Sequence, residues 1–191
     1  MPNKNNKQKG YTIIETMIAV SLFLVVVMAG MGSLLSANSV QQKSQSMRSI
    51  MDNLSFIMED MSRNLRTGYD YHCIDDGDLD ATDPHSCANG GGISFKSTAP
   101  AGQWVYYIGT YNGNSGIFRS ADGAVSFVPL TPNEVSINPV SGFSVLGAES
   151  PSVGNQQQPF VSIKLVGTIT YKDFITPFSL QTSVSQRKVD I

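Results

Sequence analysis

A nearly uninterrupted apolar segment near the start of the chain restricts its fold more than any other feature. From Tyr11 to Leu35 the sequence holds 25 residues, of which only Glu15 is charged. An α-helix of that length extends about 37 Å, whereas the hydrocarbon core of a bilayer is roughly 30 Å thick. We therefore predict that residues 11–35 form a helix that crosses a membrane.

Glu15 is an unexpected residue for a segment that only anchors the chain. On insertion scales a carboxylate in the middle of a bilayer is disfavoured by roughly 2.5–3.5 kcal/mol, so an apolar residue would anchor better. One interpretation is that this carboxylate has a charged partner. The alternative is that it lies at the level of the lipid headgroups.

The residues before the apolar segment, 1–10, are polar and basic. Three lysines and no acidic residue precede Gly10, namely Lys4, Lys7 and Lys9. This positive charge predicts a cytoplasmic N-terminus, with the rest of the chain on the outer side of the membrane. A secretory signal peptide starts in a similar way, but its apolar region is shorter. Only a weak small-residue cleavage pattern follows the segment, at Ser33, Ser36 and Ala37.

A second helical pattern follows the apolar segment. Apolar residues recur at spacings of three and four, at Met47, Ile50, Met51, Leu54, Ile57, Met58, Met61 and Leu65. Such a stripe is typical of an amphipathic helix. We therefore expect one long helix over residues 11–67, amphipathic over 36–67 and ended by Gly68. The stripe is expected to pack against the chain's own sheet, and the alternative is a free coiled-coil seam.

The remainder, residues 68–191, is rich in glycine, proline and β-forming residues. Short runs between turn residues predict strands over 93–96, 104–108, 116–120, 125–128, 135–137 and 143–146, and two longer strands over 160–171 and 174–186. Apolar and polar residues alternate in the last strand, as in an antiparallel sheet with one buried face. The predicted fold class is α+β, with the long N-terminal helix packed on an antiparallel β-sheet.

Composition argues against two functional classes. Only 15% of the residues are charged and the formal net charge is −2, without the basic patch that nucleic-acid binding requires. No nucleic-acid partner is therefore predicted. Two histidines and no nucleophile motif argue against an enzyme. Four aromatic residues fit either core and cross-strand packing or a binding surface: Trp104, Tyr106, Tyr107 and Tyr111.

Gly10 joins the basic leader to the segment Tyr11-Thr12-Ile13-Ile14-Glu15-Thr16 and the apolar helix. This arrangement resembles the N-terminus of type IV pilin-like proteins, which include pilus subunits and the pseudopilins of type II secretion systems. One departure is Tyr11, because phenylalanine is usual there. The resemblance implies the pilin fold, cleavage between Gly10 and Tyr11 by a membrane prepilin peptidase, and methylation of the new amine of Tyr11. It also implies that Glu15 meets the mature N-terminus of a neighbouring subunit and sets register during assembly.

Weaker similarities concern the kind of subunit. Residues Met58–Arg66 are similar to the helix of the J-type minor pseudopilin, and four segments look like the sheet of minor subunits: Leu130–Val135, Phe143–Val145, Pro159–Gly167 and Ser179–Arg187. They imply a minor pilin or pseudopilin whose partners are other such subunits, the prepilin peptidase, the inner-membrane assembly platform and the membrane. The alternatives are a pilus-tip adhesin, a DNA-uptake subunit and, less favoured, a membrane-anchored envelope enzyme.

The only two cysteines, Cys73 and Cys87, lie in the region predicted outside the membrane. In an oxidising compartment we expect a disulfide between them. In the chain-entropy model, closing this loop of about 15 residues contributes ~3 kcal/mol. The pairs His72-Cys73 and His85-x-Cys87 can also be drawn as a zinc site. The zinc site is not favoured, because the disulfide would consume both thiols.

An acidic loop lies between the two cysteines and contains Asp75, Asp76, Asp78, Asp80 and Asp83. The alternate spacing of Asp76, Asp78 and Asp80 suits calcium, which prefers oxygen ligands. The loop is not an EF-hand, because Ala81 occupies the position that needs glycine. A solvated loop is therefore the favoured interpretation, calcium is the alternative, and no cofactor is otherwise predicted.

Overall fold

The computed structural model describes residues 10–98, 100–150, 154, 157–172 and 174–187. Of the predicted leader, residues 1–9 lie outside this range and only Gly10 lies within it. The described residues form one helix and ten strands. The chain divides into two compact units, residues 1–45 and 46–191.

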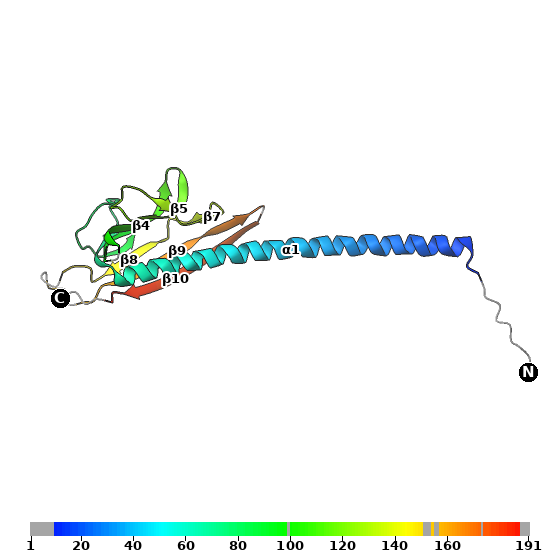
Figure 1. The fold of residues 1–191 in the computed structure, drawn as a ribbon, viewed down its shortest axis with the longest axis horizontal. Coiled ribbons are helices and arrows are strands. Elements are labelled where there is room, and N and C mark those ends of the chain that lie inside the picture. Colours follow the sequence, from blue (N-terminus) through cyan, green and yellow to red (C-terminus); the bar gives the residue numbers. More distant parts are fainter. Residues whose placement is uncertain (1–9, 99, 151–153, 155–156, 173, 188–191) are drawn as a thin grey trace, which may run out of the picture. The chain divides into compact units, whose positions relative to one another are not determined.

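The helix, α1, runs from Ile13 to Thr67 (Figure 1). The predicted helix is thus confirmed, with a start two residues later than expected. In the first unit its apolar side chains are exposed, including Ile14 (69%), Phe23 (65%) and Leu34 (72%). α1 is the one described helix that is long and apolar enough to cross a membrane.

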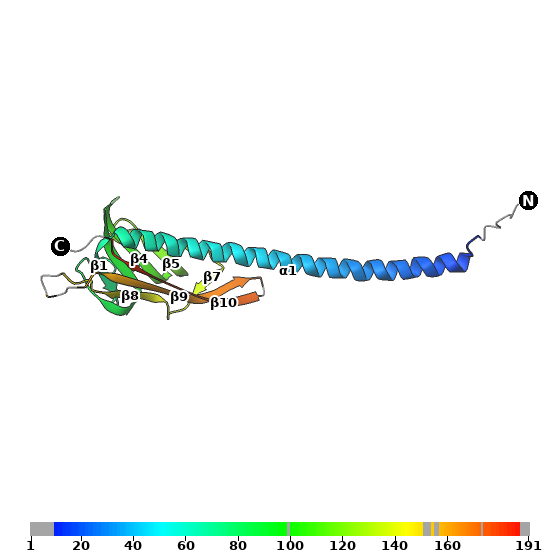
Figure 2. The same cartoon turned by 90° about the horizontal axis from the view of Figure 1, so that it is seen from below.

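The strands form two antiparallel sheets rather than the single predicted sheet. The first sheet has the order β1 (Tyr69–Ile74), β3 (Gly92–Thr98), β4 (Ala101–Tyr111), β5 (Asn114–Ser120), β6 (Val128–Pro129). The second has the order β10 (Phe174–Ser185), β9 (Phe160–Tyr171), β8 (Gly142–Leu146), β2 (Cys87–Gly90), and β7 (Val135–Ile137) also pairs with β9. In Figure 2, β9 and β10 form a long hairpin, in which all 12 residues of β10 are in register with β9.

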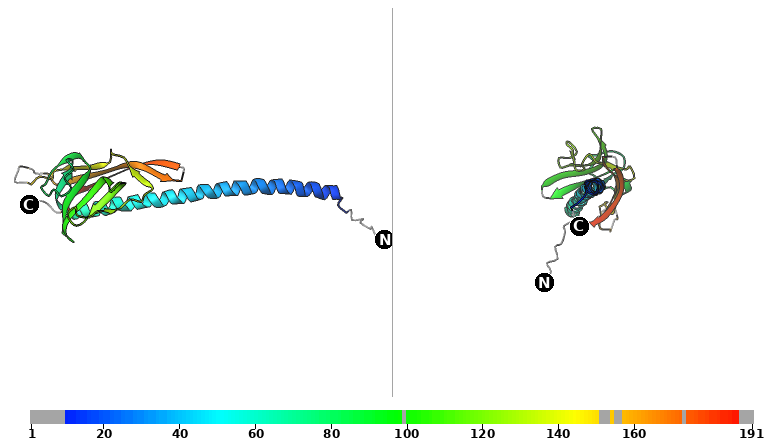
Figure 3. Two further views of the ribbon diagram at one scale, coloured as in Figure 1. Left: turned by 90° about the horizontal axis from the view of Figure 1, so that it is seen from above. Right: turned by 90° about the vertical axis from the view of Figure 1, so that its right-hand side faces the viewer.

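The second part of α1 packs into one core with both sheets. Its buried residues are Leu54, Ile57, Met58, Met61 and Leu65. They share this core with Phe95 and Tyr106 of the first sheet and with Ile163 and Leu165 of the second. In the right-hand view of Figure 3, green strands and orange-red strands lie on different sides of the helix. The predicted packing of the stripe is confirmed, and these five positions leave no free coiled-coil seam.

The end of α1 is fastened by contacts from both sheets. The Tyr71 hydroxyl of β1 is shared between the carbonyl oxygens of Leu65 and Gly68. After β10, the side-chain amide of Gln186 donates to the same Gly68 oxygen at 3.1 Å, and the Arg187 N–H donates to the Arg66 oxygen at 2.8 Å. These bonds satisfy carbonyl groups that a helix end otherwise leaves without partners.

Gly68 follows the helix as expected, and steric crowding explains why glycine is needed there. A Cβ atom at this position would lie 2.5 Å from Cδ2 of Phe95. Only glycine allows the chain to leave α1 so close to that ring.

The strand expectations are mostly confirmed, with one error and two omissions. The predicted strand over 125–128 is wrong except for Val128, because Asp122 organises a turn there by accepting hydrogen bonds from the hydroxyls of Ser120 (2.6 Å) and Ser126 (2.5 Å). The strands β1 and β2 were not predicted. Residues 87–90 lack the apolar alternation that marks a strand, whereas residues 69–73 (Tyr-Asp-Tyr-His-Cys) carry a short alternation that was missed.

Candidate maturation and assembly site

The segment from Gly10 to Glu15 lies at the beginning of α1. Gly10, Tyr11 and Thr12 precede the helix, and the Glu15 N–H donates to both the carbonyl oxygen (3.1 Å) and the hydroxyl oxygen (3.4 Å) of Thr12. Thr12 is therefore the N-cap, and Glu15 occupies the third helical position, as in the Thr-x-x-Glu capping box. This local role was not predicted, although the spacing of threonine and glutamate before an apolar run indicates it.

The predicted cleavage bond is accessible in the described chain. A Cβ atom at Gly10 would meet nothing within 4 Å, and Tyr11 is 82% exposed. Because the peptide precedes the first helical turn, its backbone is not engaged in the hydrogen-bond ladder of α1. An enzyme that acts between Gly10 and Tyr11 does not have to unfold a helix first.

Glu15 is an exposed carboxylate in the first turn of α1. The positive end of the helix dipole favours an acidic group there. No ion pair involves Glu15 among the described residues. The helix thus presents an accessible negative charge next to a long apolar surface, which is the geometry required for pairing with a cation on another molecule.

The apolar surface of α1 is not covered by the first unit itself. Exposed positions go around the helix, for example Leu22, Phe23, Val25 and Val26, which are 63%, 65%, 65% and 69% exposed. A helix that is apolar on all sides is stable only in lipid or among other helices. This part of α1 therefore needs an apolar environment from outside the chain.

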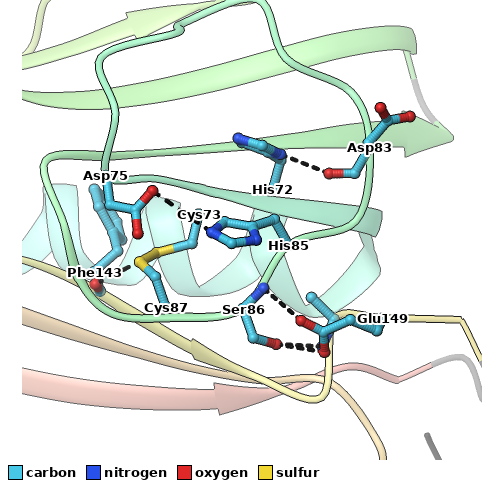
Figure 4. The surroundings of a disulfide bond; sticks show 10 residues. His72, Cys73, Asp75, Asp83, His85, Ser86, Cys87, Phe143 and Glu149 are labelled. Atoms are coloured by element: carbon cyan, nitrogen blue, oxygen red, sulfur yellow. Dashed lines mark hydrogen bonds and ion pairs between the residues drawn. A yellow bond between two sulfur atoms is a disulfide. The ribbon is translucent and has the colours of Figure 1, made fainter. Parts of the chain in front are cut away.

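The disulfide links the two sheets of the second unit. Cys73 of β1 and Cys87 of β2 are bonded, with 5.7 Å between their Cα atoms (Figure 4). The predicted pairing is confirmed. Because both sulfur atoms are consumed, the alternative zinc site loses its two thiolate ligands. Gly90 lies against the bond, since a Cβ atom there would be 2.7 Å from the Cys73 sulfur.

Two histidines lie beside the disulfide. Nδ1 of His72 is 2.6 Å from the Asp83 carbonyl oxygen, and Nε2 of His85 is 3.5 Å from an Asp75 carboxylate oxygen (Figure 4). The two ring centres are 5.3 Å apart. The backbone of His85 also exchanges hydrogen bonds with Tyr71 and Cys73, so these contacts hold the acidic loop against β1.

A carboxylate clamp holds the loop from its other end. The backbone N–H and the hydroxyl of Ser86 each donate to Glu149 at 2.8 Å, and the Ala148 N–H donates to the Ser86 hydroxyl at 3.0 Å. Partial burial opposes ionisation of Glu149, but the hydrogen bonds from Ser86 and from the backbone of Glu149 itself, together with the nearby His85, outweigh it and lower the pKa of this carboxyl group.

The aspartates of the acidic loop interact with one another. A backbone hydrogen bond from Asp78 lowers the pKa of Asp76, and a hydrogen bond with the Asp80 side chain raises the pKa of Asp78. Within the described ranges, no group of three or more histidine, cysteine, aspartate or glutamate side chains is arranged to hold a metal ion. The solvated loop stays the prediction, and calcium binding by Asp76, Asp78 and Asp80 stays its alternative.

The four aromatic residues that follow Gln103 do not share one face. Tyr106 is fully buried and stacks on Phe95, whereas Tyr107 and Tyr111 contact Phe118. Trp104 also packs on Phe95, with Arg119 over its ring at 5.4 Å. These contacts are cross-strand packing, which is the first of the two roles that the sequence allowed for these residues.

A polar contact set that the sequence did not reveal joins α1 to the first sheet. Asn64 donates to the Tyr106 hydroxyl at 2.7 Å, and this hydroxyl donates to Asp60 at 3.3 Å. Arg119 lies 3.5 Å from the same Asp60 carboxylate. Burial raises the pKa of Tyr106, so the hydroxyl stays protonated and able to donate.

The N-terminal part of the chain is similar to a known protein family. Residues 5–31 match the family model of the prokaryotic N-terminal methylation motif. This motif, together with the long apolar N-terminal helix, fits a type IV pilin-like protein. It implies processing by a prepilin peptidase and assembly with other pilins, and it indicates membrane anchoring. No curated protein and no solved structure matches the chain.

Proposed function

We propose that this protein is a minor subunit of a type IV pilus or of a type II secretion filament. The observation that carries the proposal is the methylation motif over residues 5–31, whose Gly10–Tyr11 bond lies just before the first turn of an apolar helix. The role is structural rather than catalytic: the protein is processed, held in the membrane and then incorporated into a filament.

Maturation supplies the missing partner of Glu15. Cleavage after Gly10 turns the Tyr11 nitrogen into a charged amine, and methylation keeps that charge. A carboxylate in an apolar helix bundle is unfavourable unless it is paired. Glu15 of one subunit therefore pairs with the Tyr11 amine of a neighbour, and the pair fixes the register between their apolar helices.

The orientation in the membrane follows from charge and redox chemistry. The three lysines before Gly10 keep the N-terminus in the cytoplasm. The second unit then lies outside the cytoplasm, where its Cys73–Cys87 disulfide is maintained. After assembly this unit is displayed on the filament.

The assignment to a minor subunit rests on the similarity of residues Met58–Arg66 to the J-type minor pseudopilin. In this stretch Asp60 and Asn64 contact Tyr106 of β4. This stretch thus joins the helix to the first sheet.

N-terminal sequencing and mass analysis of the protein purified from membranes test the proposal. The expected mature chain begins at Tyr11 and carries one added methyl group. A Gly10→Val variant in the same cells is expected to retain the leader. A mature wild-type chain that still begins at Met1, in cells with an active prepilin peptidase, contradicts the proposal.

A further inference from the structure

Two adjoining hollows lie along the second part of α1. The first, of about 360 Å³, lies between α1 and β10 and is lined by Met58 and Leu180 among others. The second, of about 440 Å³, lies at the end of α1 and is lined by three arginines, Arg63, Arg66 and Arg187. Glu59 and Ser62 line both hollows. They therefore form one continuous surface, called here the α1–β10 groove.

The groove changes in chemistry along its length. Met58 and Leu180 make one end partly apolar. At the other end stand three of the five arginines in the whole sequence. The only acidic residue of the lining is Glu59, whose 3.5 Å pair with Arg63 is highly exposed on both sides (70% and 73%). Such a pair is weak, so the arginine end keeps an excess of positive charge.

Backbone contacts bring the third arginine to the other two. The Gln186 N–H donates to the Pro159 oxygen at 3.0 Å, and the Arg187 N–H donates to the Arg66 oxygen at 2.8 Å. These bonds fix the chain after β10 beside the last turn of α1. Within the described ranges, neither Arg66 nor Arg187 has an ion pair. The fold thus brings two arginines without an ion pair to one surface, where they can attract an anion.

We propose that the α1–β10 groove binds an acidic segment of a partner protein. A carboxylate of the segment lies among the three arginines, because a guanidinium matches a carboxylate with two parallel hydrogen bonds. An apolar side chain of the same segment lies on Met58 and Leu180. The partly apolar end is continuous with the arginine end. The groove therefore favours a peptide over a small free oxyanion, which would use the arginine end alone.

This inference does not depend on how the N-terminus is processed, since every residue of the groove belongs to the second unit. The chemistry of the groove selects an acidic and partly apolar segment.

Fluorescence anisotropy with the full chain in uncharged detergent tests the proposal. The probe is a labelled peptide, acetyl-Leu-Ser-Glu-Glu-amide, and the matched peptide contains glutamine in place of both glutamates. We expect the glutamate peptide to bind roughly tenfold or more tightly than its glutamine form. The double variant Arg66→Gln and Arg187→Gln is expected to weaken binding of the glutamate peptide by a similar factor.

Arg48→Gln is the matched control, because Arg48 lies on the same helix but does not line the groove. It should leave peptide binding unchanged, and Leu180→Ser should weaken it. Thermal melts followed by circular dichroism establish that each variant folds.

Three results would overturn the proposal. The first is equal binding of the two peptides, and the second is an equal loss of binding in the Arg48→Gln variant. The third is displacement of the peptide by equimolar inorganic phosphate with no effect of Leu180→Ser, because the groove would then be a site for a small oxyanion.

Discussion

The two parts of α1 have the same secondary structure and opposite relations to the rest of the molecule. Residues 13–45 belong to the first unit and expose their apolar side chains, whereas Leu54, Ile57, Met61 and Leu65 in the second unit are at most 4% exposed. The difference lies in the pattern of the apolar residues. An apolar run on all sides needs an environment from outside, and a stripe with polar residues opposite needs only the chain's own sheets.

Residues in the two parts of α1 therefore affect different properties of the protein. A residue of the first part contributes to what the protein does with lipid and with other subunits. A residue of the second part contributes to the stability of the unit that carries it. Equivalent substitutions in the two parts should therefore affect different measurements.

The largest effect is expected from Glu15→Val. The variant should insert into the membrane and be cleaved after Gly10, because the substitution makes the segment more apolar. It should not enter filaments, since the charged amine of a neighbour loses its partner. Immunoblots of sheared filaments and of membranes measure the two outcomes. Normal incorporation of the variant would refute the pairing role, and an unchanged melt of the second unit serves as the folding control.

Leu54→Ala and Leu34→Ala remove the same atoms from the two parts of α1. Leu54 is fully buried, so its truncation should lower the free energy of unfolding by about 2–5 kcal/mol. Leu34 is 72% exposed, and its truncation should leave that free energy unchanged. Denaturant titrations of the full chain in micelles, followed by the fluorescence of Trp104, the only tryptophan, measure both. Equal effects of the two variants would contradict the division into two units.

The disulfide should matter for the second unit alone. The double variant Cys73→Ala and Cys87→Ala is expected to unfold with a free energy lower by about 3 kcal/mol, because the unfolded chain regains the freedom of a loop of about 15 residues. The same denaturant titration measures this loss. Addition of a reductant to the wild-type protein should produce a similar shift, and membrane insertion should not change. A reductant with no effect on the unfolding midpoint would contradict the expectation.

The smallest effect is a pH dependence from Glu149. Its pKa in the folded protein is lower than the ordinary value of 4.5, so the unfolded chain binds the proton more tightly. The stability from the Ser86 contacts is therefore fully present above pH 4.5 and is lost as the pH falls through the folded pKa. Glu149→Gln removes this dependence, because an amide does not titrate in this pH range; its oxygen can still accept one hydrogen bond from Ser86, whereas its nitrogen cannot accept the other.

The expected difference in unfolding free energy between the wild type and Glu149→Gln is small at pH 7 and smaller still below pH 4.5. Denaturant titrations at both pH values measure it. A difference that grows toward low pH would show that the carboxylate is not stabilised in the folded state.

Much of this fold can be predicted from the sequence because it follows local periodicity. The helix and the β9–β10 hairpin carry long patterns of period 3.6 and 2, and their bounds were predicted within two residues. The segments that depend on distant partners were not predicted. The strand β2 has the sequence Cys-Ala-Asn-Gly, which becomes a strand only because β8 lies beside it. Likewise, no single strand-forming segment of the sequence indicates that the strands divide into two sheets.

The candidate sites show the same division. Gly10, Tyr11 and Glu15 are read from one short motif, and the pairing of Cys73 with Cys87 follows because no other cysteine exists. The groove was not predicted, because Arg66 and Arg187 are 121 positions apart in the sequence. A backbone hydrogen bond between the Arg187 N–H and the Arg66 oxygen brings them together, and the pattern of side chains gives no indication of this bond.

The fastening of the end of α1 has a mechanical consequence. Tyr71 reaches this end from β1, and Gln186 and Arg187 reach it from the end of β10. A tension applied along the helix would pass into both sheets at the same moment. Links in parallel each bear only part of a load, whereas links in series each bear all of it. The second unit should therefore resist a pull on its helix as one body.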